Sequence, residues 1–201
     1  MTVNRREFSR QLIHMSGILL VLIPWGIDFK TMGMLLILAT GLSLLYSEFF
    51  MRRKALQRYV PWPLSLAEDA VCTIVKACER PNVRPMKGAM TFGLGIGASM
   101  ILFAPQIATL SIVALSIGDS VSTLVGVHHG THKLPRFISN HKSWEGTAAM
   151  FFSVLGVSYF FAPIGLAIAA AFVSSLVEAF DFPIDDNVTI PIVTGAALAL
   201  L

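Results

Sequence analysis

Long apolar runs separated by short polar stretches dominate the chain. The runs predict helices over about 7–26, 31–50, 88–104, 106–127, 147–162, 164–180 and 190–201. A helix that crosses the hydrocarbon core of a bilayer needs about 20 predominantly apolar residues, and most of these runs approach that length. The pattern therefore predicts an all-α polytopic membrane protein with about seven transmembrane helices, in which residues 1–201 form a single membrane-embedded domain.

Residues 51–87 break this pattern, because basic residues are interspersed there with apolar ones. Between Leu64 and Cys78, apolar side chains recur at helical spacing with charged side chains opposite them. The apolar positions are Leu66, Ala70, Val71, Ile74, Val75 and Cys78. This spacing predicts an amphipathic helix that lies in the membrane interface on the cytoplasmic side.

Composition supports a membrane protein. Hydrophobic residues make up 55% of the chain and charged residues 13%, against about 25% charged in a soluble domain. Basic residues precede the first apolar run, as in a signal peptide, but no small-residue cleavage site follows cleanly. We therefore expect a retained first helix.

The distribution of lysine and arginine predicts the orientation. The basic stretches are the N-terminal tail, 51–87 and 128–146, whereas the turns at 27–30, 104–106 and 162–164 hold one lysine between them. Short basic loops face the cytoplasm, so the N-terminus is predicted to be cytoplasmic and the C-terminus to lie outside. The acidic loop 181–189 then joins the basic loops on the cytoplasmic side. The net charge of +3 is explained by this asymmetry and indicates no nucleic-acid partner.

The first helix carries polar residues on one face. Glu7, Arg10, His14 and Gly17 are spaced so that their side chains lie above one another. Glu7 and Arg10 are compatible with two roles, an anchor at the lipid headgroups or a part of an interior site. His14 lies deeper, where an interior partner is expected.

Asp119 is an ionisable residue near the cytoplasmic end of the predicted helix 106–127. Such a residue is costly in a membrane and usually faces the bundle interior or a site. One interpretation is a structural charge that pairs with a lysine. The favoured interpretation is a ligand of Mg²⁺, a cation that takes oxygen ligands and phosphate partners.

The loop that follows is basic and bounded by glycines at Gly130 and Gly146. Lys133, Arg136 and Lys142 supply donors that suit phosphate oxygens. Ser143 is the expected N-cap of the next helix, whose first amides would face an anion. Taken alone, the loop is better explained by the topology rule for basic residues.

An acidic cluster begins in the last turn of the sixth predicted helix and continues into the loop after it. Its members are Glu178, Asp181, Asp185, Asp186 and Asn187. A solvated turn is one explanation, and a metal–nucleotide site, in which carboxylates hold the metal and cations hold the phosphates, is the favoured one. The histidines of the basic loop, with His128 and His132 at helical spacing, lack a clear fourth ligand for zinc and are expected to be exposed.

These motifs together resemble the membrane family that contains dolichol kinase, phytol kinase and CTP-dependent diacylglycerol kinase. The resemblance is carried by Glu7–Arg10–His14, Arg84 to Gly95, Gly118-Asp119 with the run Lys142 to Gly146, and Asp185-Asp186-Asn187 before Thr189-Ile190-Pro191. One departure is Gln11, where a lysine is expected. The run from Gly130 to Gly146 also resembles phosphatidate cytidylyltransferase, but the C-terminal signature of that family is absent.

The resemblance implies a catalytic domain that uses CTP as donor, Mg²⁺ as cofactor and a membrane lipid alcohol as acceptor, such as a polyprenol or dolichol, a phytol-like alcohol or diacylglycerol. Asp119, Asp185 and Asp186 would be metal or catalytic carboxylates, and Lys142 a catalytic cation. The nucleotide would be contacted by Lys133, Lys142, Ser143, Glu145, Gly146 and Asn187. Glu7, Arg10, His14 and Glu178 form a further polar site in the membrane. The alternatives are synthesis of a CDP-lipid and a membrane transporter without enzymatic activity.

Overall fold

The computed structural model describes residues 5–22, 26–52 and 83–201. Apart from an isolated β-bridge between Lys133 and Ser143, the regular structure in these residues is helical. The elements are α1 (Arg5–Met15), η1 (Ser16–Ile18), α2 (Leu19–Leu22), α3 (Phe29–Met51), α6 (Lys87–Leu102), α7 (Pro105–Val113), η3 (Ala114–Asp119), α8 (Ser120–His129), α9 (Trp144–Ser158), α10 (Ile164–Ala179) and α11 (Asp186–Leu198). The all-α prediction is confirmed for the described residues.

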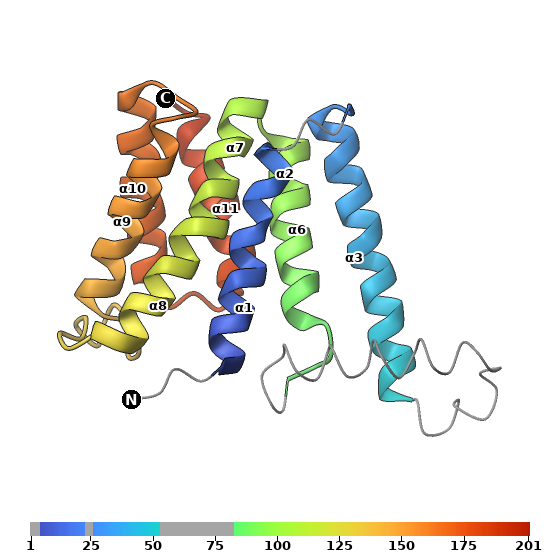
Figure 1. Ribbon diagram of the computed structural model, residues 1–201, viewed down its shortest axis with the longest axis horizontal. Helices are drawn as coiled ribbons and strands as arrows, with labels where there is room; N and C mark the ends of the chain where they lie inside the picture. The colour runs from blue at the N-terminus through green and yellow to red at the C-terminus, as the bar shows by residue number, and fades with distance from the viewer. Residues whose placement is uncertain (1–4, 23–25, 53–82) are drawn as a thin grey trace.

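The helices stand side by side with their long axes roughly aligned (Figure 1). α1, η1 and α2 follow one another as a single rod, and so do α7, η3 and α8. α3 lies at one edge beside α6, and α9 and α10 lie at the other. The start of α1, the loop from α8 to α9 and the loop from α10 to α11 share one end of the bundle, which we call the loop end.

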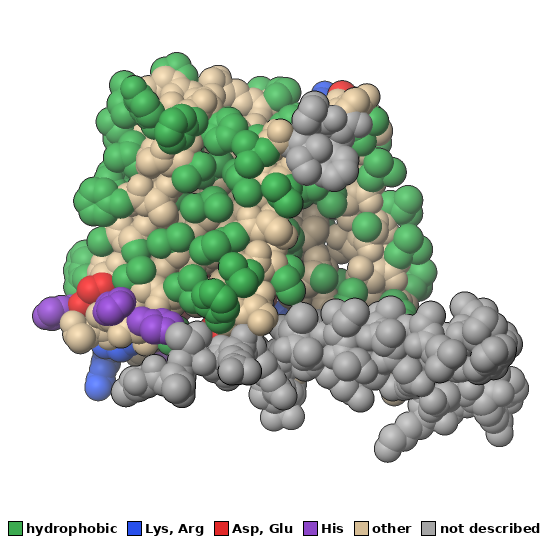
Figure 2. All heavy atoms as spheres, viewed as in Figure 1, with side chains coloured by type: hydrophobic (Ala, Val, Ile, Leu, Met, Phe, Trp, Pro, Cys, Tyr) green, Lys and Arg blue, Asp and Glu red, His purple; other side chains and the backbone are tan. Residues whose placement is uncertain are grey.

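Two helices are long and apolar enough to cross a membrane, Phe29–Met51 and the continuous rod Pro105–His129. Only 6% of the most apolar stretch of Phe29–Met51 is buried, and Figure 2 shows hydrophobic side chains over the whole height of the visible wall. An apolar surface of that extent suits contact with lipid. The crossing of the membrane by all seven predicted helices stays a prediction. The amphipathic helix predicted between Leu64 and Cys78 lies outside the described residues.

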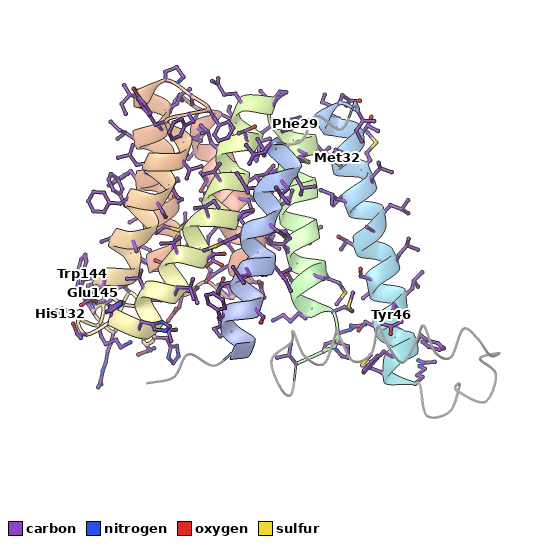
Figure 3. The ribbon with its side chains drawn as sticks, viewed as in Figure 1. Phe29, Met32, Tyr46, His132, Trp144 and Glu145 are labelled. Atoms are coloured by element: carbon purple, nitrogen blue, oxygen red, sulfur yellow. The ribbon has the colours of Figure 1, made fainter. Side chains whose placement is uncertain are left out.

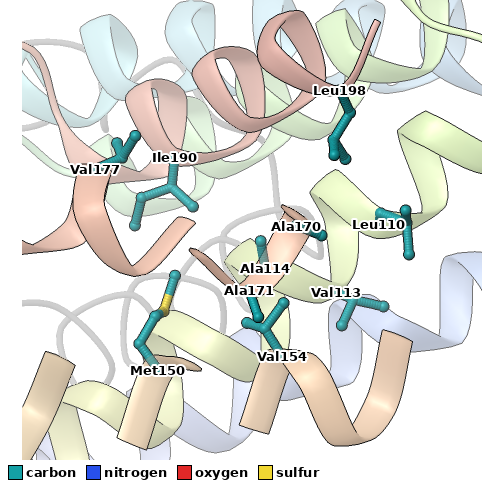
Figure 4. Packing of buried hydrophobic residues seen from close by; sticks show 10 residues of the cluster. All are labelled: Leu110, Val113, Ala114, Met150, Val154, Ala170, Ala171, Val177, Ile190 and Leu198. Atoms are coloured by element: carbon teal, nitrogen blue, oxygen red, sulfur yellow. The ribbon is translucent and has the colours of Figure 1, made fainter. Parts of the chain in front are cut away.

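Small residues let η3, α9 and α10 approach one another closely. Ala114 of η3, Ala170 and Ala171 of α10 and Val154 of α9 share one fully buried cluster (Figure 4). A Cβ atom at Gly118 would lie 2.5 Å from Cγ2 of Val154, so only glycine fits at that point of the contact between η3 and α9. Close backbone approach through small residues is typical of helix packing in membranes.

The last helix begins a turn earlier than the sequence predicts, at Asp186 instead of about residue 190. The side chain of Asp185 accepts a hydrogen bond of 3.2 Å from the backbone N–H of Asn187 and thereby caps the helix. Pro191, which lies inside the helix, does not end it. Asp186 and Asn187 are therefore held in regular helical geometry and not in a loop.

The other helix ends agree with the predictions to within a few residues. Ser143 caps α9 as predicted, because its hydroxyl accepts a hydrogen bond of 3.2 Å from the N–H of Gly146. α9 ends at Ser158, earlier than the predicted residue 162. One feature has no counterpart in the sequence pattern: η3, which ends at Asp119, is a π-helical segment. Such segments are rare and occur frequently at functional sites.

Candidate functional site

The two polar loops of the loop end are bonded to each other. The carboxylate of Asp181 accepts a hydrogen bond of 2.9 Å from the hydroxyl of Ser139 and one of 3.1 Å from the N–H of Asn140. In return, the N–H of Asp181 donates to the carbonyl of Ile138 at 3.2 Å. The acidic loop after α10 is thus fixed against the basic loop before α9.

Lys142 joins the basic loop to the residues at both ends of the acidic loop. Its Nζ donates to Oδ2 of Asp186 at 3.0 Å and to the carbonyl of Phe180 at 3.5 Å, and it also donates to the carbonyl of Glu178. An ammonium group has three donors, and all three are engaged by these acceptors. A cation at the last carbonyls of α10 also opposes the negative end of that helix's dipole.

Glu178 is buried among three helices, with 6% of its surface exposed. Its Oε1 accepts a hydrogen bond of 2.8 Å from the hydroxyl of Ser122 on α8. Its Oε2 accepts one of 3.1 Å from the hydroxyl of Thr147 on α9. The carboxylate of Glu178 therefore connects α8, α9 and α10 just inside the loop end.

Asp119 lies beside this group and is also nearly buried, with 9% of its surface exposed. No described residue donates a hydrogen bond to its carboxylate. η3, which ends at Asp119, packs against α1, α10 and α11. These helices place the charged groups of Arg10, Glu178 and Asp186 near its carboxylate. A buried carboxylate without a donor is costly to leave unmatched, so this group is available to a ligand of opposite charge.

Asp185 and Asn187 face α6. Oδ2 of Asp185 pairs with Nζ of Lys87 at 3.3 Å, and Nδ2 of Asn187 donates to the hydroxyl of Thr91 at 2.9 Å. The contact is tight, because a Cβ atom at Gly95 would lie 2.0 Å from the carbonyl oxygen of Asn187. These residues orient the start of α11, whose Asp186 points toward Lys142.

Glu145 is bonded to the beginning of the basic loop (Figure 3). Its Oε1 accepts from the hydroxyl of Thr131 at 2.7 Å and from the N–H of His132 at 3.0 Å, and it lies 2.7 Å from Nδ1 of His132. These hydrogen bonds, that of the Thr131 hydroxyl foremost, hold the pKa of Glu145 well below its usual range. Glu145 precedes the apolar stretch 147–162.

The remaining loop residues are placed as follows. Lys133 is exposed, and its Nζ donates to the carbonyl of His141 at 3.2 Å. A Cβ atom at Gly146 would lie 3.2 Å from the carbonyl oxygen of Ser122, so the start of α9 runs close to α8. The hydrogen bonds of Lys133 and Glu145 are made within the basic loop. Among the described residues, the group near the acidic loop is therefore formed by Asp119, Lys142, Glu178 and Asp186 without these two.

The polar face of α1 borders this group. Arg10 donates to the carboxylate of Glu7 through Nε at 3.3 Å and Nη2 at 2.5 Å. Gln11, where the resemblance leads one to expect lysine, is fully buried and donates to Oε1 of Glu7 at 2.9 Å. The ring of His14 packs edge-on against Phe92, with centroids 4.7 Å apart.

The fit of a metal ion depends on these carboxylates. In the part of the chain that the structure describes, no three His, Cys, Asp or Glu side chains are close enough to hold a metal by themselves. Mg²⁺ in phosphoryl-transfer sites is held by one or two carboxylates together with substrate phosphates and water. Asp119, to which no described residue donates a hydrogen bond, and Asp186 would supply these one or two carboxylates.

The sequence assigned no role to Thr147, Thr91 and Lys87, which bond Glu178, Asn187 and Asp185. A threonine in an apolar helix commonly bonds the carbonyl one turn before it, so Thr147 carries no signal that it faces Glu178. Lys87 and Thr91 lie within the glycine-rich start of α6, and their partners are about 100 residues away, Thr91 and Asn187 being 96 apart.

Comparison with known proteins identifies distant relatives. The chain is 33% identical over 119 residues to a phytol kinase of Synechocystis sp., covering 55% of this chain and 50% of that protein. It is 32% identical over 136 residues to a chloroplastic farnesol kinase of Arabidopsis thaliana, covering 58% of this chain and 43% of that protein. An uncharacterized protein of Methanocaldococcus jannaschii is 27% identical over 194 residues, covering 94% of this chain and 91% of that protein.

The chain is a distant homologue of phytol and farnesol kinases, which confirms the resemblance identified from its motifs. It spans about half the length of these two relatives. No protein-family model matches the chain, and no solved structure is significantly similar to it.

Proposed function

We propose that this distant homologue of phytol and farnesol kinases is a membrane kinase that transfers the γ-phosphoryl group of CTP to a prenol-type alcohol. The observation that carries the proposal is the group formed by Asp119, Lys142, Glu178 and Asp186 at the loop end. Carboxylates beside a lysine ammonium are the parts that phosphoryl transfer requires, because its catalysis consists mainly of positioning and charge neutralisation.

In the proposed reaction the oxygen of the alcohol attacks the γ-phosphorus. The bond from the γ-phosphorus to the oxygen bridging it to the β-phosphorus breaks, and CDP leaves with that oxygen. The hydroxyl proton goes to a carboxylate at the start of α11, Asp185 or Asp186. Asp119 and Asp186 would hold Mg²⁺, which when bound neutralises charge on the β- and γ-phosphate oxygens. Lys142 adds positive charge next to Asp186.

The position of the site suits a substrate with an apolar chain. Asp119 lies at the end of η3, within the rod Pro105–His129 that is long and apolar enough to cross a membrane. The hydroxyl of a membrane-dissolved alcohol would reach the group from the lipid, and CTP from the aqueous side of the loops. Because the relatives include a phytol kinase and a farnesol kinase, we favour an alcohol of the phytol or farnesol class over dolichol or diacylglycerol as acceptor.

We propose that the chain is an integral membrane protein. In the proposed orientation, the site and the first residues lie on the cytoplasmic side. It is supported by the basic loops at the loop end and by the exposed apolar side chains along the helices.

The experiment is a transfer assay with purified protein in detergent and in vesicles. CTP labelled in the γ- or the α-phosphate is combined with phytol, farnesol, a long polyprenol or diacylglycerol. The expected result is label in lipid from the γ-position only, dependent on added Mg²⁺. Asp119→Asn and Asp186→Asn should lower the rate by at least about 100-fold, whereas Lys30→Met, an exposed substitution at the opposite end, should not change it.

Two outcomes would contradict the proposal. Label from the α-position would indicate transfer of the cytidylyl group to a lipid phosphate instead. Absence of transfer with every alcohol and with both CTP and ATP would exclude the kinase, and an effect of Asp119→Asn on vesicle transport without nucleotide consumption would then favour a transporter.

A further inference from the structure

α1 contributes a cation to the group described above. α1 packs against η3, the segment that ends at Asp119, and Arg10 is one of two cations near that carboxylate, the other being Lys142. α1 also packs against α8, where Oγ of Ser120 lies 3.5 Å from the carbonyl oxygen of Gln11. Arg10 therefore approaches Asp119 from α1, which belongs to neither of the two polar loops.

Arg10 is held in place by two contacts. Both Nε and Nη2 donate to the carboxylate of Glu7, and Glu7 is in turn bonded by the fully buried Gln11. A guanidinium group bonded in this way keeps one orientation, as does the lysine of protein kinases that is held by a glutamate while it contacts phosphates. Glu7 and Gln11 thus act as positioning residues for Arg10.

The donors of Arg10 are not exhausted by this pair. A guanidinium group has five N–H donors, of which Glu7 engages two, and no other described residue accepts from Arg10. In contrast, all three donors of Lys142 are bonded to protein oxygens. Arg10 is therefore better prepared than Lys142 to bond phosphate oxygens without breaking an existing contact.

A lipid-headgroup anchor is the other explanation for an arginine near the end of a membrane helix. The burial pattern of α1 argues against it. The side chains that face outward are apolar: Phe8 is 46%, Leu12 51% and Ile13 53% exposed. Arg10 is 23% exposed and lies on the same side of the helix as the buried Gln11 and His14.

We infer that Arg10 is a phosphate-binding catalytic residue, delivered by α1 to the phosphoryl group under transfer and oriented by Glu7 and Gln11. The inference rests on the proposed function. A planar guanidinium binds two phosphate oxygens at once, and an arginine in that role stabilises the charge of the transition state.

The test combines turnover with direct binding of CTP, measured on the full chain in a non-ionic detergent without phospholipid. Removing phospholipid separates binding of nucleotide phosphate from binding of a lipid headgroup. The variants are Arg10→Gln, Arg10→Lys and Glu7→Gln. Arg52→Gln is the matched control, because Arg52 is exposed and caps the C-terminal end of α3.

The expected result is a loss of at least about 100-fold in kcat for Arg10→Gln with a smaller change in KM for the alcohol. Arg10→Lys keeps the charge without the planar fork and should recover part of the loss, by about 10-fold. Glu7→Gln should lower kcat less than Arg10→Gln. CTP binding should weaken in Arg10→Gln and not in Arg52→Gln.

The double substitution Glu7→Gln with Arg10→Gln removes both charges together and leaves neither unpaired, so it separates misfolding from a loss of chemistry. A folded Arg10→Gln or double variant with normal kcat and normal CTP binding would overturn the role of Arg10 and leave the kinase intact. If the wild type binds CTP more tightly than Arg10→Gln does but transfers phosphate to no alcohol, the binding role of Arg10 is supported and the kinase is overturned. Wild-type protein that binds neither CTP nor ATP would overturn both.

Discussion

Lys142 and Asp186 form an ion pair of 3.0 Å that joins the basic loop to the first residue of α11. The lysine is also bonded to the carbonyls of Glu178 and Phe180 at the end of α10. This arrangement fixes the spacing between the two loops and, with it, the distance from Asp186 to the other carboxylates.

Lys142→Met should therefore lower both stability and activity. It leaves Asp186 without its cation and two carbonyls without a donor, and we expect a loss of about 1–3 kcal/mol in the free energy of unfolding. Denaturation of the purified protein in mixed micelles measures it. Lys30→Met removes an exposed lysine at the opposite end and should be neutral; equal stability of the two variants would refute the bridging role.

Ser122 and Thr147 should be coupled through Glu178. Ser122→Ala or Thr147→Val removes one donor from a buried carboxylate, which costs about 1–3 kcal/mol each. Because both bond the same group, the double variant should depart from the sum of the single effects by at least about 0.5 kcal/mol. Ser153→Ala serves as the control, because the hydroxyl of Ser153 bonds the carbonyl of Met150 and not Glu178. Strict additivity of the Ser122 and Thr147 effects would contradict the shared contact.

Gly95→Ala should displace the start of α11. The added Cβ would lie 2.0 Å from a backbone oxygen of Asn187, which cannot move without shifting the helix, and overpacking of this kind costs about 1–3 kcal/mol. Gly156→Ala is the matched control, because nothing lies within 4 Å of its Cβ position and alanine is the better helix former. Thermal midpoints of the two variants should move in opposite directions; a tolerated Gly95→Ala would show that α6 and α11 are not so closely packed.

The contacts of Glu145 should make stability depend on acid pH. Hydrogen bonds from Thr131 and His132 lower the pKa of Glu145 in the folded protein below its ordinary value of 4.5. A group whose pKa is lowered by folding stabilises the protein above its unfolded pKa, and this contribution is lost as the pH falls below about 4.5.

The measurement is the thermal midpoint of wild-type protein and Glu145→Gln between pH 7 and pH 3. The wild type should be the more stable at neutral pH, and the difference should shrink as the solution is acidified below pH 4.5. A difference that stays constant over this range would mean that the charge of Glu145 contributes nothing to the loop.

The sequence by itself determined the helices and the end of the bundle at which the chemistry gathers. Hydropathy and capping are local properties, so the apolar runs and Ser143 predicted α3, α6 and the start of α9. The charge pattern likewise predicted that Asp119 and the two polar loops lie at one end. The start of α11 was missed by a turn, because the cap made by Asp185 outweighs the polar character of the residues after it.

The tertiary structure decided which partner each polar side chain takes. Ser122 and Glu178 are 56 residues apart, and Lys142 and Asp186 are 44 apart. Contacts at such separations depend on how whole helices pack, which leaves no periodic signal along the chain. For the same reason the sequence treated Asp185 and Asp186 alike. In the structure Asp185 is the N-cap of α11 and Asp186 its first residue, and their side chains point in different directions: Asp185 pairs with Lys87 and Asp186 with Lys142.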